Sequence, residues 1–472
     1  MVVVTVRFLH ARHVVLGEGD GLRVGPATIG VEDGRIVSVT EGDLAQTRAD
    51  VDEDLGALLV APAFINAHTH LAMVGFRGLV GNEALRGNVV EDLFFRLESK
   101  MVAQDVRAFT RLGALESLRH GVARVWDHYY FAESIAAGMH DVGLHGVVAP
   151  TLQDLGGPGV QQRDAQMLAT EALTRDAWRD RGIHAALGPH ATDTVSAALW
   201  SAIVSMAQAH QLPVHVHVAQ SIEEYARIDA RHGLSPLGWL EQLGVLAQVP
   251  KLLAVHAIFV SERDLQRLDP RRHALGYCPL SQQQFCFPAH VPSWQAAGIP
   301  WIVGTDCAMS NDAMNVQREL VQVAGIRGFG ASSGEAYARF RGSPSLDAAR
   351  AVDARRTADL DAYGTLAEPK TLLASVWSVP GRLHPAFTAG VIEPGAQADL
   401  VVFDPGHPSL WPGHDLLRAL AYCDTSSALH GLMVGGQWRI EPGRLDAWLH
   451  AEAHEEARRE AEARLEALEA QI

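Results

Sequence analysis

Residues 213–221 read PVHVHVAQS, a short apolar run that carries His215 and His217 and ends close to Gln220. Successive side chains of a β-strand point to opposite faces, so the two histidines share one face and the three valines share the other. Its length and β-branched residues are typical of a buried strand. The two imidazoles either fill a core or belong to a site at the end of this strand.

Runs of the same kind recur along the chain, and helix-like segments such as 196–210 and 235–246 separate them. Eight strands that alternate with helices predict an α/β fold, a (β/α)8 TIM-type barrel in preference to an open doubly wound sheet. The first run to Asp306 covers about 250 residues, the usual size of such a barrel. The eight predicted strands are 58–70, 122–130, 143–152, 183–192, 213–221, 251–259, 273–281 and 300–306.

The two ends of the chain have a different texture, with short alternating strands and a hairpin signal at EDG, residues 32–34. GAQADLVVFDP and GLMVGGQWRIE repeat this texture near the C-terminus. A Gly- and Arg-rich stretch at 325–368 predicts an insertion or a mobile segment. We therefore expect a small β-sandwich domain formed by both chain ends (1–57 and 384–445), a catalytic barrel (58–383) and a C-terminal helix (446–472).

The composition narrows the class of function. The 472 residues include 39 basic and 55 acidic residues, a net charge of −16, which disfavours a nucleic-acid partner. Four cysteines are too few for a disulfide scaffold, and no apolar stretch is long enough to span a membrane. We expect a cytoplasmic homo-oligomer that acts on a small molecule, without a nucleic-acid or membrane partner.

Metal-binding side chains gather at the predicted carboxyl ends of the strands, where barrels of this type carry their active sites. A lone histidine on an apolar strand is more often a packing residue than a ligand, roughly four times in five. Histidines at four strand ends, together with Asp306 at a fifth, favour a metal site. Neutral imidazoles with one carboxylate suit a divalent ion such as zinc, with a position left for water. The candidate residues are His68, His70, His190, His217, His256 and Asp306.

Four motifs resemble the signatures of the amidohydrolase superfamily, and more narrowly its triazine-hydrolase and deaminase branch. They are PAFINAHTHLAM (62–73), HVHVAQSIEE (215–224), VHAIF (255–259) and GTDCAMSND (304–312). VARVWDHYYFAESIAAGM and GPHATDTVS further resemble the members that deaminate S-adenosylhomocysteine, methylthioadenosine and related nucleosides. The resemblance covers nearly the whole chain. It implies a metal-dependent hydrolase of non-peptide C–N bonds, which releases ammonia from a nitrogen heterocycle or its nucleoside.

The resemblance also implies the metal site and its ion. The metal ligands would be His68, His70, His217 and Asp306. Relatives with two metals bridge them with a carboxylated lysine, whereas no lysine of this chain (Lys100, Lys251, Lys370) lies at the carboxyl end of a predicted strand. We therefore expect one divalent ion per chain, zinc or alternatively iron.

Further residues take roles from the same resemblance. A metal ion lowers the pKa of its bound water to about 7, and Asp306 would accept the proton that this water loses. His256 would polarise the attacked centre or shuttle protons. His190 would contact the substrate, and Glu91 would hold ribose hydroxyls. His215 lies one step deeper on the face of His217, about 6.6 Å down the strand, and is expected to support the site or fill the core.

Gln220 departs from the pattern, because the deaminases that the sequence resembles carry a proton-donating glutamate at this place. An amide donates a hydrogen bond but cannot supply a proton to form a cation. Either His256, Glu223 or Glu224 delivers the proton, or the substrate does not need protonation. In the second case Gln220 would bind the substrate by a hydrogen bond. The second option favours hydrolytic displacement of a substituted amine, halide or amide nitrogen from a heterocycle. A catalytically silent binding module is a third alternative, which the complete ligand set argues against.

Overall fold

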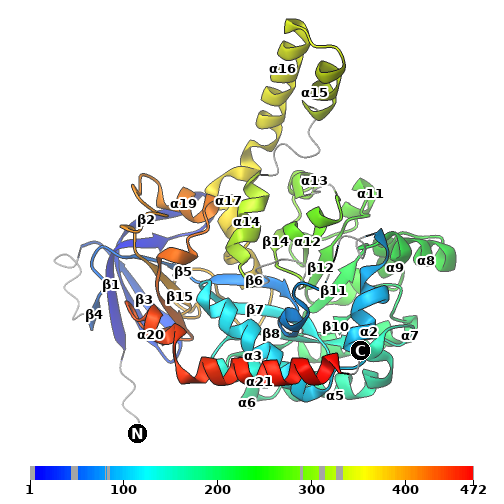
Figure 1. Ribbon diagram of the computed structural model, residues 1–472, viewed down its shortest axis with the longest axis horizontal. Coiled ribbons are helices and arrows are strands. Elements are labelled where there is room, and N and C mark those ends of the chain that lie inside the picture. Colours follow the sequence, from blue (N-terminus) through cyan, green and yellow to red (C-terminus); the bar gives the residue numbers. More distant parts are fainter. Residues whose placement is uncertain are drawn as a thin grey trace.

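The computed structural model describes residues 6–43, 52–79, 81, 86–287, 291–307, 314–325 and 333–470. Parallel sheets flanked by helices form the body, and a mixed β-sheet lies beside it, at the left of Figure 1. The motif residues 308–312, parts of the predicted β-domain (1–5 and 44–51) and the last two residues of the predicted C-terminal helix lie outside the described residues.

Two parallel sheets carry the predicted strands. One has the order β10-β8-β7-β6, with β9 beside β8, and the other has the order β11-β12-β13-β14. Isolated bridges pair Leu187 with Val214 and Thr69 with Asp306, so the edges of the two sheets adjoin on both sides. The strands are β6 (Phe64–Thr69), β7 (Val122–Tyr129), β8 (His145–Leu152), β9 (Ile183–Ala185), β10 (Gly188–Pro189), β11 (Val214–Val218), β12 (Leu252–His256), β13 (His273–Tyr277) and β14 (Trp301–Val303).

The predicted alternation of strands and helices is confirmed. Every residue of β6, β7, β11, β12 and β13 is buried, as expected where helices cover parallel strands. The helices that follow the strands are α2 (Phe95–Glu98), α3 (Ala103–Arg119), α4 (Ala132–Val142), α5 (Arg163–Leu173), α6 (Asp176–Arg179), α7 (Ala197–His210), α8 (Ile222–His232), α9 (Pro236–Gln242), α10 (Val245–Gln248), α11 (Glu262–Leu265), α12 (Pro279–Gln284), α13 (Val291–Ala296), α14 (Val316–Gly325), α17 (Pro369–Ala374) and α18 (Ser378–Gly381).

Both ends of the chain contribute to the mixed sheet, in the order β17-β16-β15-β5-β1-β2-β3, with β4 beside β1. Among the described residues, no helix is both long and apolar enough to cross a membrane. The strands are β1 (Arg7–Leu16), β2 (Arg23–Glu32), β3 (Arg35–Glu41), β4 (Glu53–Asp54), β5 (Leu59–Pro62), β15 (Leu400–Phe403), β16 (Leu429–Val434) and β17 (Gln437–Ile440).

The predicted first strand, 58–70, is two strands that belong to different sheets. β5 pairs with β1 and β15 in the mixed sheet, whereas β6 pairs with β7. The change occurs at Pro62, which has no N–H to continue the ladder. The N–H of Ala63 donates to Asp399 O (3.0 Å), and that of Phe64 donates to Gly121 O (3.0 Å) on the other side.

A buried ion pair joins the two parts of the fold. Arg124 of β7 donates to the Asp399 carboxylate just before β15, with Nη2 and Oδ2 2.9 Å apart and both side chains almost fully buried. The two residues are 275 positions apart in the chain. The mixed sheet is therefore held to the parallel strands by a charge pair as well as by apolar packing.

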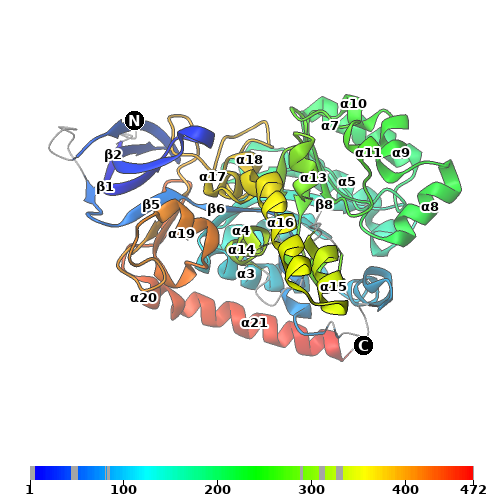
Figure 2. The same cartoon turned by 90° about the horizontal axis from the view of Figure 1, so that it is seen from above.

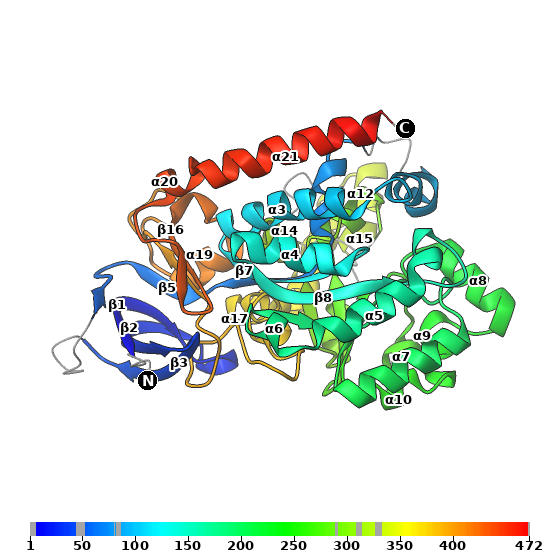
Figure 3. The same cartoon turned by 90° about the horizontal axis from the view of Figure 1, so that it is seen from below.

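Two helical elements lie outside this body. α15 (Ser333–Gly342) and α16 (Leu346–Tyr363), within the predicted insertion, form an arm that projects from the body (Figures 1 and 2). α21 (Glu452–Glu469) lies along α3 (Figure 3), where Arg464 Nε is 2.5 Å from Asp105 Oδ1. The remaining elements are η1 (Gly19–Gly21), η2 (Leu71–Phe76), η4 (Val90–Phe94), η5 (Pro158–Gln162), η7 (Gly364–Ala367), α19 (Leu416–Tyr422), η8 (Ser426–Ala428) and α20 (Leu445–Leu449).

Candidate active site

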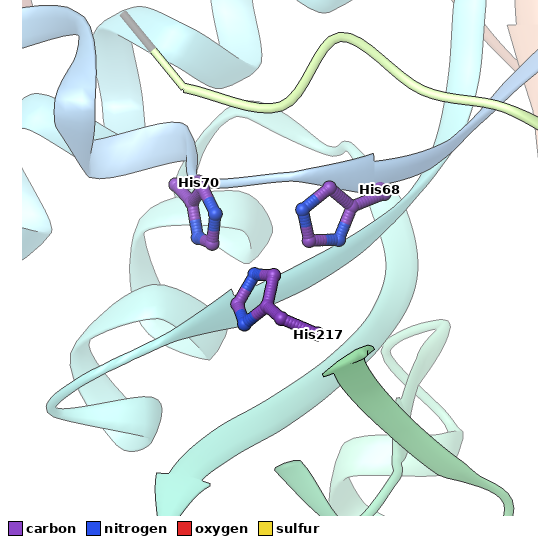
Figure 4. Close-up of side chains that lie close together, drawn as sticks. All are labelled: His68, His70 and His217. Atoms are coloured by element: carbon purple, nitrogen blue, oxygen red, sulfur yellow. The ribbon is translucent and has the colours of Figure 1, made fainter. Parts of the chain in front are cut away.

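Three imidazoles converge at the carboxyl ends of β6 and β11 (Figure 4). The ring centroids of His68 and His70 are 4.9 Å apart, and those of His217 lie 5.0 and 5.5 Å from them. Asp306, just beyond β14, places Oδ1 3.5 Å from His68 Nε2 and 3.4 Å from His70 Nε2. The four predicted ligands therefore meet in one small, buried volume.

The backbone at these strand ends is strained. His256 and Asp306 have φ angles of 74° and 60°, in the left-handed region that residues with a Cβ rarely adopt, and Ala219 has a φ of 53°. Strained backbone conformations of this kind cluster at functional sites, and they persist only where neighbouring contacts hold the residue in place. At Asp306 those contacts include β6, since its N–H donates to His68 O (3.1 Å) and its carbonyl accepts from His70 N (3.3 Å).

Hydrogen bonds to the opposite ring nitrogens orient the imidazoles. His70 Nδ1 lies 2.5 Å from His128 O and His217 Nδ1 lies 2.6 Å from His190 O. A carbonyl only accepts, so both Nδ1 atoms carry a proton, and the neutral form of either ring has its free lone pair on Nε2. His68 Nδ1 lies 2.7 Å from Nε2 of His215, which answers the question of that residue: it supports His68.

This donor set fits a divalent metal ion. His68 Nε2 is buried without a hydrogen-bond partner among the described residues, although it faces the other imidazoles. Burial lowers the pKa of His68 to about 3 and holds the pKa of His217 well below its ordinary value, so both rings are neutral. Neutral imidazoles with one carboxylate are the ligands that zinc and similar ions prefer.

A cavity of about 300 Å³ opens above these ligands. His70, His217 and Asp306 lie on its surface, and Phe95 packs against His190 with ring centroids 5.3 Å apart. Aromatic walls above a polar floor suit a flat, heteroaromatic small molecule. The aromatic lining residues are Phe94, Phe95, Tyr129, Tyr130, Phe285 and Phe287.

The other predicted site residues also reach this cavity: Glu91, His190, Gln220 and His256 line it. The His256 ring stacks on that of His217, with centroids 5.4 Å apart and planes 13° apart. His256 also groups with His68 and Asp306 closely enough to join a metal site. Its position is therefore compatible with the predicted supporting role and with ligation.

The Glu91 carboxylate, which the sequence assigned to the substrate, is already engaged by an arginine. Both of its carboxylate oxygens accept from the Arg227 guanidinium, and Arg227 Nη1 also lies 2.9 Å from Asp193 Oδ2. Arg227 belongs to α8, whose Arg231 donates to Asp193 O at 2.7 Å. Side chains of α8 thus connect the segment of Glu91 with the loop after β10, and Glu91, Asp193 and Arg227 all line the cavity.

The two acids after Gln220 differ in their environment. Glu223 is half-buried, whereas Glu224 is buried and its two oxygens lie 2.5 Å from Thr192 Oγ1 and 2.8 Å from Gln220 N. Burial raises the pKa of Glu224 to about 7, with the charge of Asp193 adding to the effect. Glu224 therefore holds the turn that carries Gln220.

Sequence reasoning missed two residues of the site. Glu98 is buried on the cavity wall, and burial raises its pKa to about 7. Ser281 donates to Asp306 Oδ2 at 2.6 Å. Ser281 ends the predicted strand 273–281, so its place at a strand end was a usable signal, whereas Glu98 lies in a helical segment with no such signal.

Comparisons with known proteins agree with this geometry. Residues 59–353 match the profile of the amidohydrolase family. A 5-methylthioadenosine/S-adenosylhomocysteine deaminase of Haloarcula marismortui is 30% identical over 404 residues, 84% of each chain. An adenosine deaminase from Xanthomonas campestris with bound zinc has a TM-score of 0.78 at 23% identity, covering 97% of this chain and 98% of that one. For an atrazine chlorohydrolase of Arthrobacter aurescens with zinc the values are 0.76, 18%, 97% and 99%. The chain belongs to the amidohydrolase family.

Proposed function

We propose that the protein is a metal-dependent aminohydrolase that releases ammonia from an adenine nucleoside altered at its 5′ position. The observation that carries the proposal is the convergence of three imidazoles and Asp306 on the floor of an aromatic cavity. The Haloarcula relative, named a 5-methylthioadenosine/S-adenosylhomocysteine deaminase, supports the substrate class. The broader activity, hydrolysis of a C–N bond in a nitrogen heterocycle, follows from the same site and family.

The residues that would hold one divalent ion, zinc in our proposal, are His68, His70, His217 and Asp306. When bound, the ion would lower the pKa of a water molecule and so supply a nucleophile at neutral pH. Asp306 would accept a proton from the attacking water, because its carboxylate faces the same volume as the imidazoles. His256 lies beside them and is assigned to orient the attacked centre.

Gln220 meets the substrate through its amide. The backbone N–H of Gln220 donates to Glu224. The side-chain amide lies at the cavity surface, where it can donate a hydrogen bond to a ring nitrogen. Phe94 and Phe95 would stack against the heterocycle. His190, also on the cavity surface, is assigned to contact the same ring.

A second candidate reaction rests on Gln220 alone. Gln220 cannot protonate a ring nitrogen as a glutamate would. Hydrolytic displacement of a substituted amine, halide or amide nitrogen from a heterocycle does not require that protonation. The amide then only orients the substrate. This reaction uses the same ligands and the same cavity.

The described sheets also support a proposal for the fold as a whole. We propose that the two parallel sheets form one (β/α)8 barrel, since bridges adjoin their edges on both sides. The mixed sheet would form the β-sandwich domain from both chain ends, with its boundary near Ala63 because β5 pairs within that sheet. The homo-oligomeric state and the cytoplasmic location stay predictions from the sequence.

Two measurements test the proposed function. Elemental analysis of the purified protein should give one divalent ion per chain, and two ions would refute the mononuclear site. Ammonia release should be highest for 5′-modified adenosines in a panel that also contains purines, pterins and triazines. Turnover of a chlorinated triazine without turnover of any nucleoside would favour the second reaction.

A further inference from the structure

The two oxygens of the Asp306 carboxylate have different surroundings. Oδ1 faces the imidazoles, 3.5 Å from His68 Nε2 and 3.4 Å from His70 Nε2. Oδ2 accepts a hydrogen bond from Ser281 Oγ at 2.6 Å. A bond this short to an ionised oxygen is of the strong, charge-assisted kind.

Ser281 is itself held from behind. It lies in α12, directly after β13, where Leu280 N donates to Glu319 Oε2 at 2.9 Å. Glu319 comes from α14 and is completely buried. The first turn of α12 is therefore anchored by a buried carboxyl, and the hydroxyl of Ser281 keeps a fixed position relative to β14.

The backbone of Asp306 gives this bond its importance. Its left-handed φ of 60° is a conformation that the chain does not prefer, and bonds to β6 hold only the main chain. A short carboxylate side chain can rotate about its Cα–Cβ bond unless another contact stops it. Ser281 is only 4% exposed, so little of its side chain is open to water although it lines the cavity.

We propose that Ser281 is a positioning residue that fixes the side-chain rotamer of Asp306 and so presents Oδ1, and not Oδ2, to the metal ion. The inference rests on the proposed metal site and adds a residue to it that is not a ligand. Replacing the hydroxyl leaves Oδ2 buried without this donor, a state that costs free energy whenever Oδ1 alone binds the ion. The carboxylate would then rotate between several arrangements.

The test compares Ser281→Ala and Ser281→Thr with Ser375→Ala. Ser375 is an equally buried serine whose hydroxyl also donates at 2.6 Å, to Leu372 O, but it does not line the cavity. For each protein, zinc affinity is measured by competition with a chelator, together with the Tm of the metal-free form. Both are read without substrate.

We expect Ser281→Ala to bind zinc about 10- to 100-fold more weakly, the range for residues that orient metal ligands. Its metal-free Tm should match that of Ser375→Ala, and Ser281→Thr, which keeps the hydroxyl, should restore affinity. With an active substrate, kcat should fall more than KM changes. Unchanged zinc affinity in folded Ser281→Ala overturns the proposal, and so does an equal loss in Ser375→Ala. Failure of the wild type to bind zinc would instead refute the proposed metal site.

Discussion

Replacing Glu224 with glutamine should leave catalysis almost unchanged and remove a pH-dependent loss of stability. Glutamine has the same shape, and its amide can satisfy both neighbours: its oxygen accepts from Gln220 N, and its NH2 donates to Thr192 Oγ1. The turn that carries Gln220 therefore stays in place. If Glu224 were instead the proton donor of the reaction, the same change would cost about 10²- to 10⁴-fold in kcat.

The stability effect follows from the buried carboxyl. Burial raises the pKa of Glu224 from 4.5 to about 7 in the folded protein. Between these values the folded chain binds the proton and the unfolded chain does not, so the free energy of unfolding falls as the pH rises through this window. At about 1.4 kcal/mol for each pH unit, the wild type should lose about 3 kcal/mol that the variant keeps.

Urea unfolding of the metal-free proteins at pH 5 and pH 8 measures this difference, and kcat/KM on the best substrate measures the catalytic effect. Glu223→Gln is the comparison variant: Glu223 is half-buried and should leave the pH dependence of stability as in the wild type, and because it also lines the cavity, its kcat/KM tests the neighbouring acid as proton donor. A folded Glu224→Gln protein that has lost 100-fold or more in kcat, with Glu223→Gln unaffected, would refute the structural role assigned to Glu224.

Further outcomes test the ligands and the substrate-facing residues. Changing His68 or Asp306 to alanine should abolish both metal retention and turnover; full activity in either variant contradicts the ligand assignment. His256→Ala should keep its metal but lose about 10²- to 10⁴-fold in activity, the contribution typical of a general acid or base; loss of metal, by elemental analysis, would make His256 a ligand. Gln220→Glu should lower kcat/KM on the native substrate by about 10²- to 10³-fold, the effect of one lost oriented donor, and an unchanged enzyme rules out the hydrogen bond.

Much of the site could be predicted because it lies at strand ends. His68, His217, His256 and Asp306 follow apolar, β-branched runs, and parallel strands bring their carboxyl ends to one place. The split of the first predicted strand was missed, although Pro62 was visible, because the apolar run continues through it. Periodicity cannot tell which sheet a strand joins.

Contacts between distant segments could not be predicted in the same way. Arg227 donates to the Glu91 carboxylate although the two residues are 136 positions apart in the chain. The sequence therefore contained no sign of this ion pair when Glu91 was assigned to the substrate. The assignment of the missing proton donor to Glu223 or Glu224 depends on burial, which two adjacent acids do not reveal in sequence. Only the fold separates the half-buried Glu223 from the fully buried Glu224.

The Arg124–Asp399 pair has a consequence for the order of events during synthesis. Ribosomes add about 5–20 residues per second, so the partner of Arg124, 275 positions later, emerges roughly 14–55 s after it. Burying an arginine without its counter-charge costs about 3–5 kcal/mol, so a nascent chain gains little by packing β7 fully before then. We therefore expect β7 to stay incompletely packed, and accessible to chaperones, until Asp399 has been synthesised.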